Sequence, residues 1–367
     1  MGKLLIFHPI IAPYRINFFN GLTEAFETMV CLTMKNMPNQ TFDYSKIEEQ
    51  FHFAPTYLTR KTLKIQRGIF STIREFNPDV VLVSECGIVS VFAIVARFLF
   101  RKKYAIVSIV DDSYNMVAEN NYFSWSHKIA EKILFPFFDN IICVEPRVVS
   151  HFQRLYGKGI CFPIIVDETE SLRRYGKILP ISETYVRNYG LQGKKVLLFV
   201  GRLVELKNIQ MVIPVFRRLE SADIRFVLVG SGDYEDQLKN LAQGDDRIIF
   251  VGRKEGDELY AWYNIASCFV LASYQEAFGA VTNEALLGGC WCLVSEKAGS
   301  NCLIEDGKNG FIFDPHNSSV FEEKLRLSLQ NSVAVQLPLC ARKSLMQCSF
   351  NDMLSNVIKE LQKSTNN

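Results

Sequence analysis

Short apolar runs alternate with longer segments of helical periodicity along most of the 367-residue chain. Runs of this length and composition are typical of parallel strands, because crossover helices bury both faces of a parallel sheet. The alternation therefore predicts two series of strands, each joined by helices. The first series is expected at 3–7, 28–33, 80–84, 104–109, 140–144 and 160–165, and the second at 195–200, 225–229, 247–251, 267–271 and 291–294.

The segment 166–194 breaks this rhythm with charged residues, Gly176, Pro180 and Gly193, and we interpret it as a linker. It separates an N-terminal domain, 1–165, from a C-terminal domain, 195–349. The apolar stripe of 350–363 predicts a helix that packs back on the first domain. The predicted fold class is α/β, with two tandem Rossmann-like, doubly wound domains that face a cleft at the carboxyl ends of their strands.

The charges of the whole chain are nearly balanced, with 41 Lys and Arg against 39 Asp and Glu. A net charge of +2 gives no reason to expect nucleic acid as a partner. Residues 1–165 carry 18 basic and 14 acidic side chains, so the first domain is mildly basic. The ten cysteines have no metal-binding spacing, so we expect buried free thiols and no metal site.

Two apolar segments bear on localisation. The run at 3–7 is too short for a secretory signal, and the segment 86–96 falls far below the ~20 residues that a membrane span needs. We therefore expect 86–96 to form a buried helix and the protein to be cytoplasmic.

Polar groups that could bind a ligand follow four successive strands of the second domain. Cations and glycines at strand tips suit a diphosphate, because guanidinium, ammonium and exposed backbone N–H groups all bind phosphate oxygens. A solvated helix entrance is the plain alternative at each position taken alone. The strand-tip residues in question are Gly201, Arg202, Lys207, Gly230, Arg253 and Glu276.

The segment 271–289 carries two glutamates, Glu276 in a turn-rich junction and Glu284 on the helix that follows. Small residues surround Glu284 on its helix face, which leaves its carboxylate uncovered and in need of a polar partner. The backbone N–H groups of Phe278, Gly279 and Ala280 at the start of that helix suit an anion. An acidic first turn with one solvated Glu is the plain alternative.

The order of these motifs resembles the group 1 glycosyltransferases, which are retaining enzymes of the GT-B fold. The similar stretches are 200–208, 227–241, 248–289 and 302–313. The resemblance implies that Glu276 contacts hydroxyls of the donor sugar and that Glu284 holds the ribose of the nucleotide. It also implies that Arg202 and Lys207 neutralise the diphosphate leaving group, without a metal ion.

The first domain resembles bacterial envelope-sugar transferases more loosely, through the start at 8–22. Asp111 and Asp112 follow a strand where relatives have a residue that touches the donor sugar, so Asp111 is a catalytic candidate; capping of a turn is the alternative. On the acceptor side, the candidates are His8, Tyr14, Arg15 and Asp112.

Three stretches of the first domain, 59–67, 101–103 and 125–138, are basic or rich in both cations and aromatic rings. They are consistent with a peripheral site on the anionic inner face of a membrane that carries a lipid-linked acceptor, and an ordinary solvated face is the alternative. The sequence thus predicts a metal-independent glycosyltransferase of cell-surface polysaccharide synthesis, such as lipopolysaccharide or capsule, that uses UDP-sugars rather than GDP-sugars. A GT-B sugar-nucleotide epimerase and a non-catalytic nucleotide-sugar-binding protein stay open as alternatives.

Overall fold

The computed structural model divides the chain into two compact units. Unit 1 comprises residues 1–166 and 350–367, and unit 2 comprises residues 167–349. The structure describes all residues except 35–46, 59–61, 120–121 and 365–367, and the side chains of 62–67 are not described either.

Unit 1 is built on a parallel seven-stranded sheet with the order β3-β2-β1-β4-β5-β6-β7. Its strands are β1 (Lys3–His8), β2 (Glu27–Leu32), β3 (Thr56–Tyr57), β4 (Val80–Ser84), β5 (Ala105–Val110), β6 (Asn140–Cys143) and β7 (Ile160–Cys161). Its helices are η1 (Pro13–Arg15), α1 (Ile16–Ala25), α3 (Thr62–Phe76), α4 (Ile88–Leu99), η2 (Asn115–Glu119), α5 (Trp125–Leu134), η3 (Phe135–Phe137), α6 (Pro146–Tyr156) and α14 (Phe350–Ser364).

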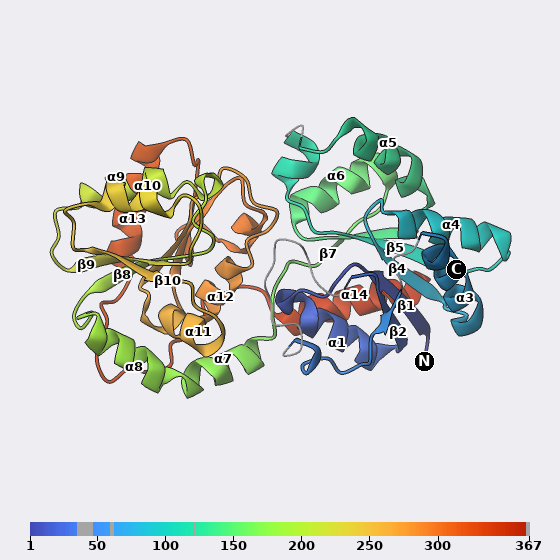
Figure 1. Ribbon diagram of the computed structural model, residues 1–367, viewed down its shortest axis with the longest axis horizontal. Coiled ribbons are helices and arrows are strands. Elements are labelled where there is room, and N and C mark those ends of the chain that lie inside the picture. The colour runs from blue at the N-terminus through green and yellow to red at the C-terminus, as the bar shows by residue number, and fades with distance from the viewer. Residues whose placement is uncertain (35–46, 59–61, 120–121, 365–367) are drawn as a thin grey trace. The chain divides into compact units, whose positions relative to one another are not determined.

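Helices cover both faces of this sheet, with α3 to α6 on one side and α1 and α14 on the other (Figure 1). The strands are apolar on both faces for this reason, since neither face meets water. α14 reaches the sheet because α1 has a glycine at the crossing. A Cβ on Gly21 would lie 2.3 Å from a methyl carbon of Leu354, so a larger residue there would push α14 away.

Unit 2 is built on a parallel six-stranded sheet with the order β10-β9-β8-β11-β12-β13. Its strands are β8 (Lys195–Val200), β9 (Ile224–Val229), β10 (Ile248–Gly252), β11 (Cys268–Leu271), β12 (Trp291–Ser295) and β13 (Gly310–Phe313). Its helices are α7 (Glu168–Lys177), α8 (Leu179–Asn188), η4 (Glu205–Lys207), α9 (Ile209–Arg217), α10 (Glu235–Ala242), α11 (Gly256–Ile265), α12 (Val281–Leu287), η5 (Gly299–Leu303) and α13 (Ser318–Asn331).

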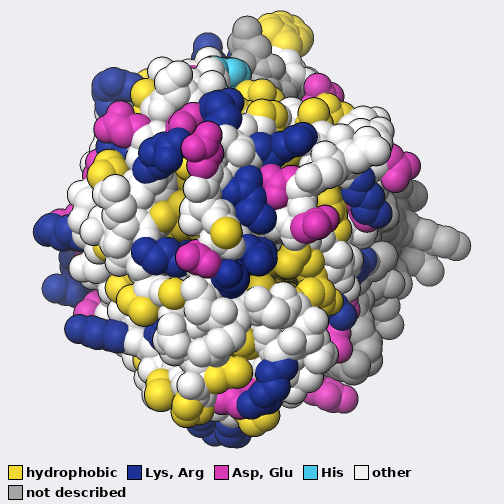
Figure 2. Space-filling view, turned by 90° about the vertical axis from the view of Figure 1, so that its left-hand side faces the viewer, with side chains coloured by type: hydrophobic (Ala, Val, Ile, Leu, Met, Phe, Trp, Pro, Cys, Tyr) yellow, Lys and Arg dark blue, Asp and Glu magenta, His cyan; other side chains and the backbone are white. Residues whose placement is uncertain are grey.

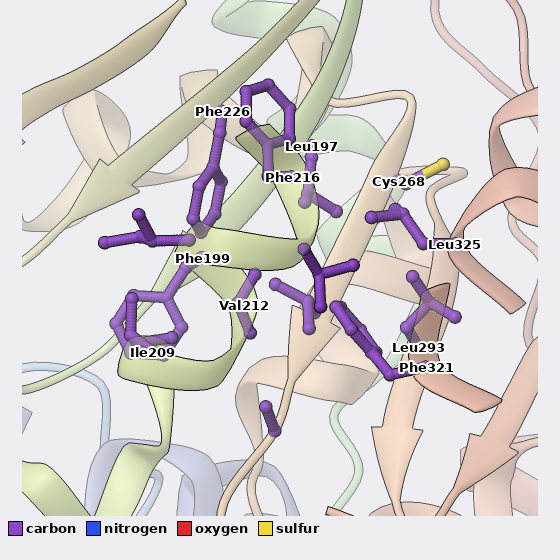
Figure 3. Close-up of a cluster of buried hydrophobic side chains, with 14 of the residues drawn as sticks. Leu197, Phe199, Ile209, Val212, Phe216, Phe226, Cys268, Leu293, Phe321 and Leu325 are labelled. Atoms are coloured by element: carbon purple, nitrogen blue, oxygen red, sulfur yellow. The ribbon is translucent and has the colours of Figure 1, made fainter. Parts of the chain in front are cut away.

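The core of unit 2 lies between its sheet and the helices α9, α10 and α13 (Figure 3). Phe199 and Phe226 from neighbouring strands meet Phe216 of α9, and the rings of Phe216 and Phe226 lie 5.5 Å apart. Leu293 and Phe321 continue this layer toward α13. Aromatic side chains of this size bury much apolar surface, so the strand tips of unit 2 stand on a rigid base.

The structure corrects the interpretation of 166–194 as a linker. The segment forms α7 and α8, which pack on α11 within unit 2. The ring of Tyr185 stacks on the buried Trp262 at 4.9 Å, and Ser182 donates a hydrogen bond to the Ala261 carbonyl at 3.1 Å. The glycines and charges that suggested a linker lie at helix ends and on the solvent side, so the periodicity of the helices was missed.

The strands differ from the prediction in three places. β3 and β13 were not expected, because they have only two and four residues. The run 160–165 forms a strand only at Ile160–Cys161. Pro163 lacks a backbone N–H group, so it cannot donate to the ladder.

Helix α4 differs from the expected buried helix. It buries Ala93, Ile94 and Ala96, but Ile88 and Leu99 on its other side are exposed. None of the described helices is long and apolar enough to cross a membrane.

Each sheet has one place where two neighbouring strands lead their connections in opposite directions. In unit 1 this switch point lies between β1 and β4, and in unit 2 it lies between β8 and β11. Loops at the carboxyl ends of such strands splay apart, which makes the switch point the usual ligand site of an open α/β sheet.

Candidate active site

An ion pair lies at the switch point of unit 2. Lys207 comes from the loop after β8 and Glu276 from the loop after β11, and the ammonium group of Lys207 donates to Oε2 of Glu276. The two side chains are 14% and 19% exposed, so the pair is shielded but can still be reached from solvent. Ser273 donates a further hydrogen bond to Oε2 at 3.2 Å. The structure therefore brings together two of the catalytic candidates, which are 69 residues apart in sequence.

Glycines shape the loops on the β8 side of this pair. A Cβ on Gly230 would lie 1.8 Å from the carbonyl oxygen of Gly201, so the tips of β8 and β9 touch through their backbones. Both residues have φ near +150°, a value that side chains rarely allow. This packing explains Gly230 without any ligand, whereas the sequence suggested donor binding. Lys207 is then fixed by Asn208, which has φ of 56° and donates to the Pro315 carbonyl at 2.8 Å.

The loop between β11 and α12 places free backbone donors beside Glu276. The N–H groups of Phe278, Gly279 and Ala280 make no hydrogen bond with a described residue. Gly279 has φ of 91°, and a Cβ there would lie 3.3 Å from Cγ of Glu276 and 2.5 Å from Leu271. α12 itself has only seven residues, so its dipole adds little. The loop's N–H groups, rather than the helix end, are what a ligand could use.

Glu284 is held by two tyrosines of α11. Tyr263 donates to one carboxylate oxygen at 2.8 Å and Tyr260 to the other at 3.1 Å. Burial raises the pKa of the Glu284 carboxyl, and the hydroxyls of Tyr263 and Tyr260 and the charge of Arg174 oppose that rise. Arg174 reaches the group from α7 and stacks over the ring of Tyr260 at 3.9 Å. These tyrosines were not predicted, because the sequence does not reveal which side chains a helix turns toward Glu284.

Two other candidates stay apart from the Lys207–Glu276 pair. Arg202 is exposed at the tip of β8 and makes no ion pair with a described residue. Arg253 follows β10, the strand at the sheet edge, and pairs there with Glu255. Arg202 is thus available to a ligand at the switch point. Arg253 lies farther from it, because the strands β9 and β8 separate β10 from β11.

Unit 1 also holds an ion pair near its switch point. The guanidinium of Arg15, from η1, donates to Asp111, which follows β5. Arg15 is only 1% exposed and packs over the rings of Phe18 and Phe162. This enclosure argues against direct contact of Arg15 with a glycan, and its place on the acceptor side stays a prediction. Its Nε and Nη1 atoms have no hydrogen-bond partner among the described residues.

The remaining candidates of unit 1 lie at the ends of β1 and β5 or just beyond. His8 shares a hydrogen bond of 2.7 Å with the Ile10 carbonyl, and burial lowers the pKa of its ring. Tyr14 is part-buried in η1. Asp112 follows Asp111, and burial raises its pKa to about 6.

The partner of Asp112 is Glu85, which sequence reasoning missed. Glu85 directly follows β4 with φ of 44°, a strained value for a residue with a side chain. Burial raises the pKa of its carboxyl to about 8, and the neighbouring carboxylates of Asp112 and Asp111 add to that rise. The two side chains share a hydrogen bond, so Glu85 carries the proton and Asp112 accepts. The usable signal was its position at a strand tip, the same signal that identified Glu276.

Residues 182–342 match the family model described as "Glycosyl transferases group 1", and this segment contains every donor-side residue described above except Arg174. Unit 2 is a group 1 glycosyltransferase domain. The two glutamates and the cations after β8 therefore lie within the glycosyltransferase segment itself. Unit 1 lies outside the match.

Two curated glycosyltransferases extend the similarity beyond unit 2. The sulfoquinovosyl transferase SQD2 of Arabidopsis thaliana is 25% identical over 86% of this chain. The N-acetylgalactosamine-N,N'-diacetylbacillosaminyl-diphospho-undecaprenol 4-alpha-N-acetylgalactosaminyltransferase of Campylobacter jejuni is 24% identical over 65% of this chain. The chain spans 62% and 64% of the lengths of these two relatives.

The fold also matches a solved structure with bound UDP. The crystal structure of Anabaena Alr3699/HepE in complex with UDP superimposes with a TM-score of 0.71 at 16% identity, covering 100% of this chain and 96% of that one. At this identity the match establishes the fold, and the two parallel sheets with interleaved helices are those of the GT-B fold.

Proposed function

We propose that the protein transfers a sugar from a nucleotide-diphosphate sugar to a hydroxyl group of a glycan or lipid-linked acceptor. The observation that carries the proposal is the Lys207–Glu276 pair at the switch point of a group 1 glycosyltransferase domain. A cation and a carboxylate that solvent can still reach, beside free backbone N–H groups, suit a ligand with both phosphates and hydroxyls. A nucleotide sugar has both.

The charge that develops on the leaving diphosphate determines the roles of the cations. When the bond from the sugar's anomeric carbon to the phosphate oxygen breaks, its electron pair stays on the diphosphate. Lys207 and the exposed Arg202 stabilise this charge, together with the N–H groups of 278–280. Charge that these groups neutralise needs no divalent ion, so we propose metal-independent transfer. UDP is the proposed nucleotide, supported by the UDP bound in the similarly folded Anabaena protein.

The two glutamates accept hydrogen bonds from different parts of the donor. Glu276 moves from Lys207 to the hydroxyls of the donor sugar, while Lys207 turns to the diphosphate. Glu284 accepts from the ribose hydroxyls, and its two tyrosine partners keep the carboxylate in one orientation. Transfer proceeds with retention, as is general for the family that unit 2 belongs to.

Unit 1 is the proposed acceptor side, and the acceptor is a lipid-linked cell-surface glycan of the lipopolysaccharide or capsule type. The Campylobacter relative, whose name specifies a diphospho-undecaprenol acceptor, supports this. So does the basic surplus of residues 1–165. Peripheral attachment to the inner face of the plasma membrane belongs to the same proposal.

A donor screen with product analysis tests the proposal. Purified protein is mixed with UDP- and GDP-sugars, binding is followed by thermal shift, and the products are separated by chromatography. Stabilisation by UDP-sugars and release of UDP on adding a glycan or lipid-linked acceptor are expected. A new epimer of the donor would instead indicate an epimerase, and tight binding without release or transfer would indicate a binding protein.

A matched pair of variants locates the activity. Lys207→Ala should slow UDP release by about 10²-fold, whereas Lys239→Ala should not, because Lys239 forms an exposed ion pair with Glu235 on α10. Turnover should also persist within about twofold in EDTA, since two cations take the metal's place. Loss of turnover in EDTA with recovery in Mg²⁺ or Mn²⁺ would contradict the metal-independent part.

A further inference from the structure

Unit 1 exposes an apolar surface where α4 meets the end of α5. It is formed by Val95, Phe98 and Leu99 of α4, Ile133 of α5 and Phe137 of η3, and we refer to it as the α4–α5 surface. Phe98, Leu99 and Ile133 are 62%, 65% and 58% exposed. The three α4 residues share one helix face, because they are spaced by three and four.

The two parts of this surface are joined by direct contacts. The rings of Phe98 and Phe137 meet edge to face at 6.0 Å. Arg97 donates to the Phe137 carbonyl at 2.7 Å and to Asp139 at 2.8 Å, which fixes η3 against the last turn of α4. These contacts hold the exposed end of α4 against η3, the segment that directly follows α5.

Unpaired cations border the patch. Arg101 and Lys103 are exposed directly after α4 and make no ion pair with a described residue. The segment 86–110 has four Lys and Arg and no Asp or Glu. By contrast, the face of unit 2 seen in Figure 2 mixes Lys and Arg with Asp and Glu, and hydrophobic side chains are scattered among them.

Monomeric proteins rarely leave several large apolar side chains exposed together, and such patches mark interaction sites. We propose that the α4–α5 surface docks on an anionic lipid bilayer. Phe98, Leu99 and Ile133 enter the boundary between headgroups and acyl chains, while Arg101 and Lys103 contact lipid phosphates. The charges favour this partner over another protein, because Arg97 neutralises the nearby Asp139, and the exposed Arg101 and Lys103 are left to complement a surface of negative charge.

This inference extends the proposed membrane attachment by identifying the residues that dock. It rests on the proposed function only in its choice of an anionic membrane as the partner. It revises the sequence interpretation, which expected α4 to be buried. The basic stretch 59–67 was also expected to contribute. Residues 59–61 lie outside the described part of the chain, and the side chains of 62–67 are not described.

Sedimentation with vesicles tests the inference. The full chain is mixed with phosphatidylcholine vesicles with and without phosphatidylglycerol, at low and high salt. The wild type should pellet with the anionic vesicles at low salt only. Phe98→Asp/Leu99→Asp should weaken binding by about tenfold or more. Arg101→Ala and Lys103→Ala should each weaken it by about fivefold.

Two control variants carry matched changes elsewhere. Val333→Asp alters a side chain of unit 2 that is 78% exposed, and Lys359→Glu alters an exposed cation on the outer side of α14. Both should bind vesicles as the wild type does. Thermal unfolding and UDP binding should be unchanged in all variants, which separates this result from a failure of the donor site.

Three outcomes would overturn the inference. One is wild-type protein that pellets equally with neutral and anionic vesicles, or with neither. Another is a Phe98→Asp/Leu99→Asp double variant that binds anionic vesicles as well as the control variant Val333→Asp does. The third is a dimer on size-exclusion chromatography that this double variant dissociates, with no vesicle binding, because a second copy of the chain would then cover the surface.

Discussion

Units 1 and 2 share one architecture and both hold an ion pair near the switch point of the sheet, but the two pairs differ in burial. In unit 2, Lys207 and Glu276 are similarly exposed, at 14% and 19% of their side chains. In unit 1, the side chains of Arg15 and Asp111 are 2% and 32% exposed. A ligand can therefore separate the first pair and bind both partners, whereas Arg15 can only hold Asp111 in place. The exposure of the unit 2 pair supports the proposed ligand binding, whereas the burial of Arg15 favours a supporting role for the pair of unit 1.

The acidic side chains of the two units differ in how many hydrogen-bond donors and cations surround them. Those of unit 2 are matched by donors, with Lys207 and Ser273 on Glu276 and two tyrosines on Glu284. Unit 1 instead crowds Glu85, Asp111 and Asp112 together, and among the described residues Arg15 is the one cation that pairs with them. Burial, and then the nearby carboxylates of Asp112 and Asp111, raises the pKa of Glu85 to about 8, which favours Glu85 as a donor and Asp112 as an acceptor toward a hydroxyl.

The largest expected effect is on Glu276. Glu276→Ala should lower the rate of transfer by about 10²–10³-fold, because it removes a polar group that acts on the reacting sugar. The melting temperature should change little. Kinetics of UDP release and thermal unfolding check this, with Glu235→Ala as the control on α10. Near-normal transfer in Glu276→Ala would remove it from the site.

Mutation of the Arg15–Asp111 pair in unit 1 should instead lower the stability of the fold. Asp111→Ala leaves the buried guanidinium of Arg15 without a counterion, which should destabilise the fold by on the order of 3 kcal/mol. Denaturant unfolding measures this loss. A variant that is as stable as the wild type would show that the Arg15–Asp111 pair does not support the fold.

Tyr263→Phe should have a smaller effect that depends on pH. The hydroxyl of Tyr263 opposes the rise in the pKa of Glu284, so its loss raises that pKa further. Less carboxylate is then present to accept from the ribose, and the KM for the donor should rise by about tenfold at low pH. The difference should shrink as pH rises, because Glu284 ionises in both proteins. An equal difference at every pH would indicate a structural role only.

The smallest effect is expected for Glu85→Gln. Burial raises the pKa of Glu85 to about 8 in the folded state, whereas a Glu in the unfolded chain has a pKa near 4.3. Stability therefore falls as pH rises between these values. Gln imitates the protonated form, so the variant should match the wild type near pH 5 and gain on the order of 1 kcal/mol above pH 8. Thermal unfolding at both pH values measures the difference, and an equal shift at both would contradict it.

Much of the donor side could be predicted from the sequence because its signals are local. Strand tips such as Gly201 and Glu276 follow short apolar runs, and parallel strands place their carboxyl ends at one edge of the sheet. The pairing of Glu85 with Asp112 depends instead on which strands are neighbours, which local patterns do not reveal. The same reason hid the tyrosines that hold Glu284.

Helix amphipathicity explains the other errors. α7 and α8 were taken as a linker because charges and glycines outnumber their buried residues, yet Tyr175 and Val186 pack in unit 2. α4 is apolar all round, which in a soluble protein predicts burial. Its second apolar face is exposed instead, and this departure led to the proposed lipid surface.

The central claim is that the nucleotide binds at the switch point of unit 2, and hydrogen–deuterium exchange with and without UDP tests it most directly. The free N–H groups of 278–280 should become protected on binding, together with residues 201–208 and the start of α12. Residues 84–86 and 111–114 of unit 1 should exchange at unchanged rates. Protection confined to unit 1, or none in unit 2 at saturating UDP, would contradict the account.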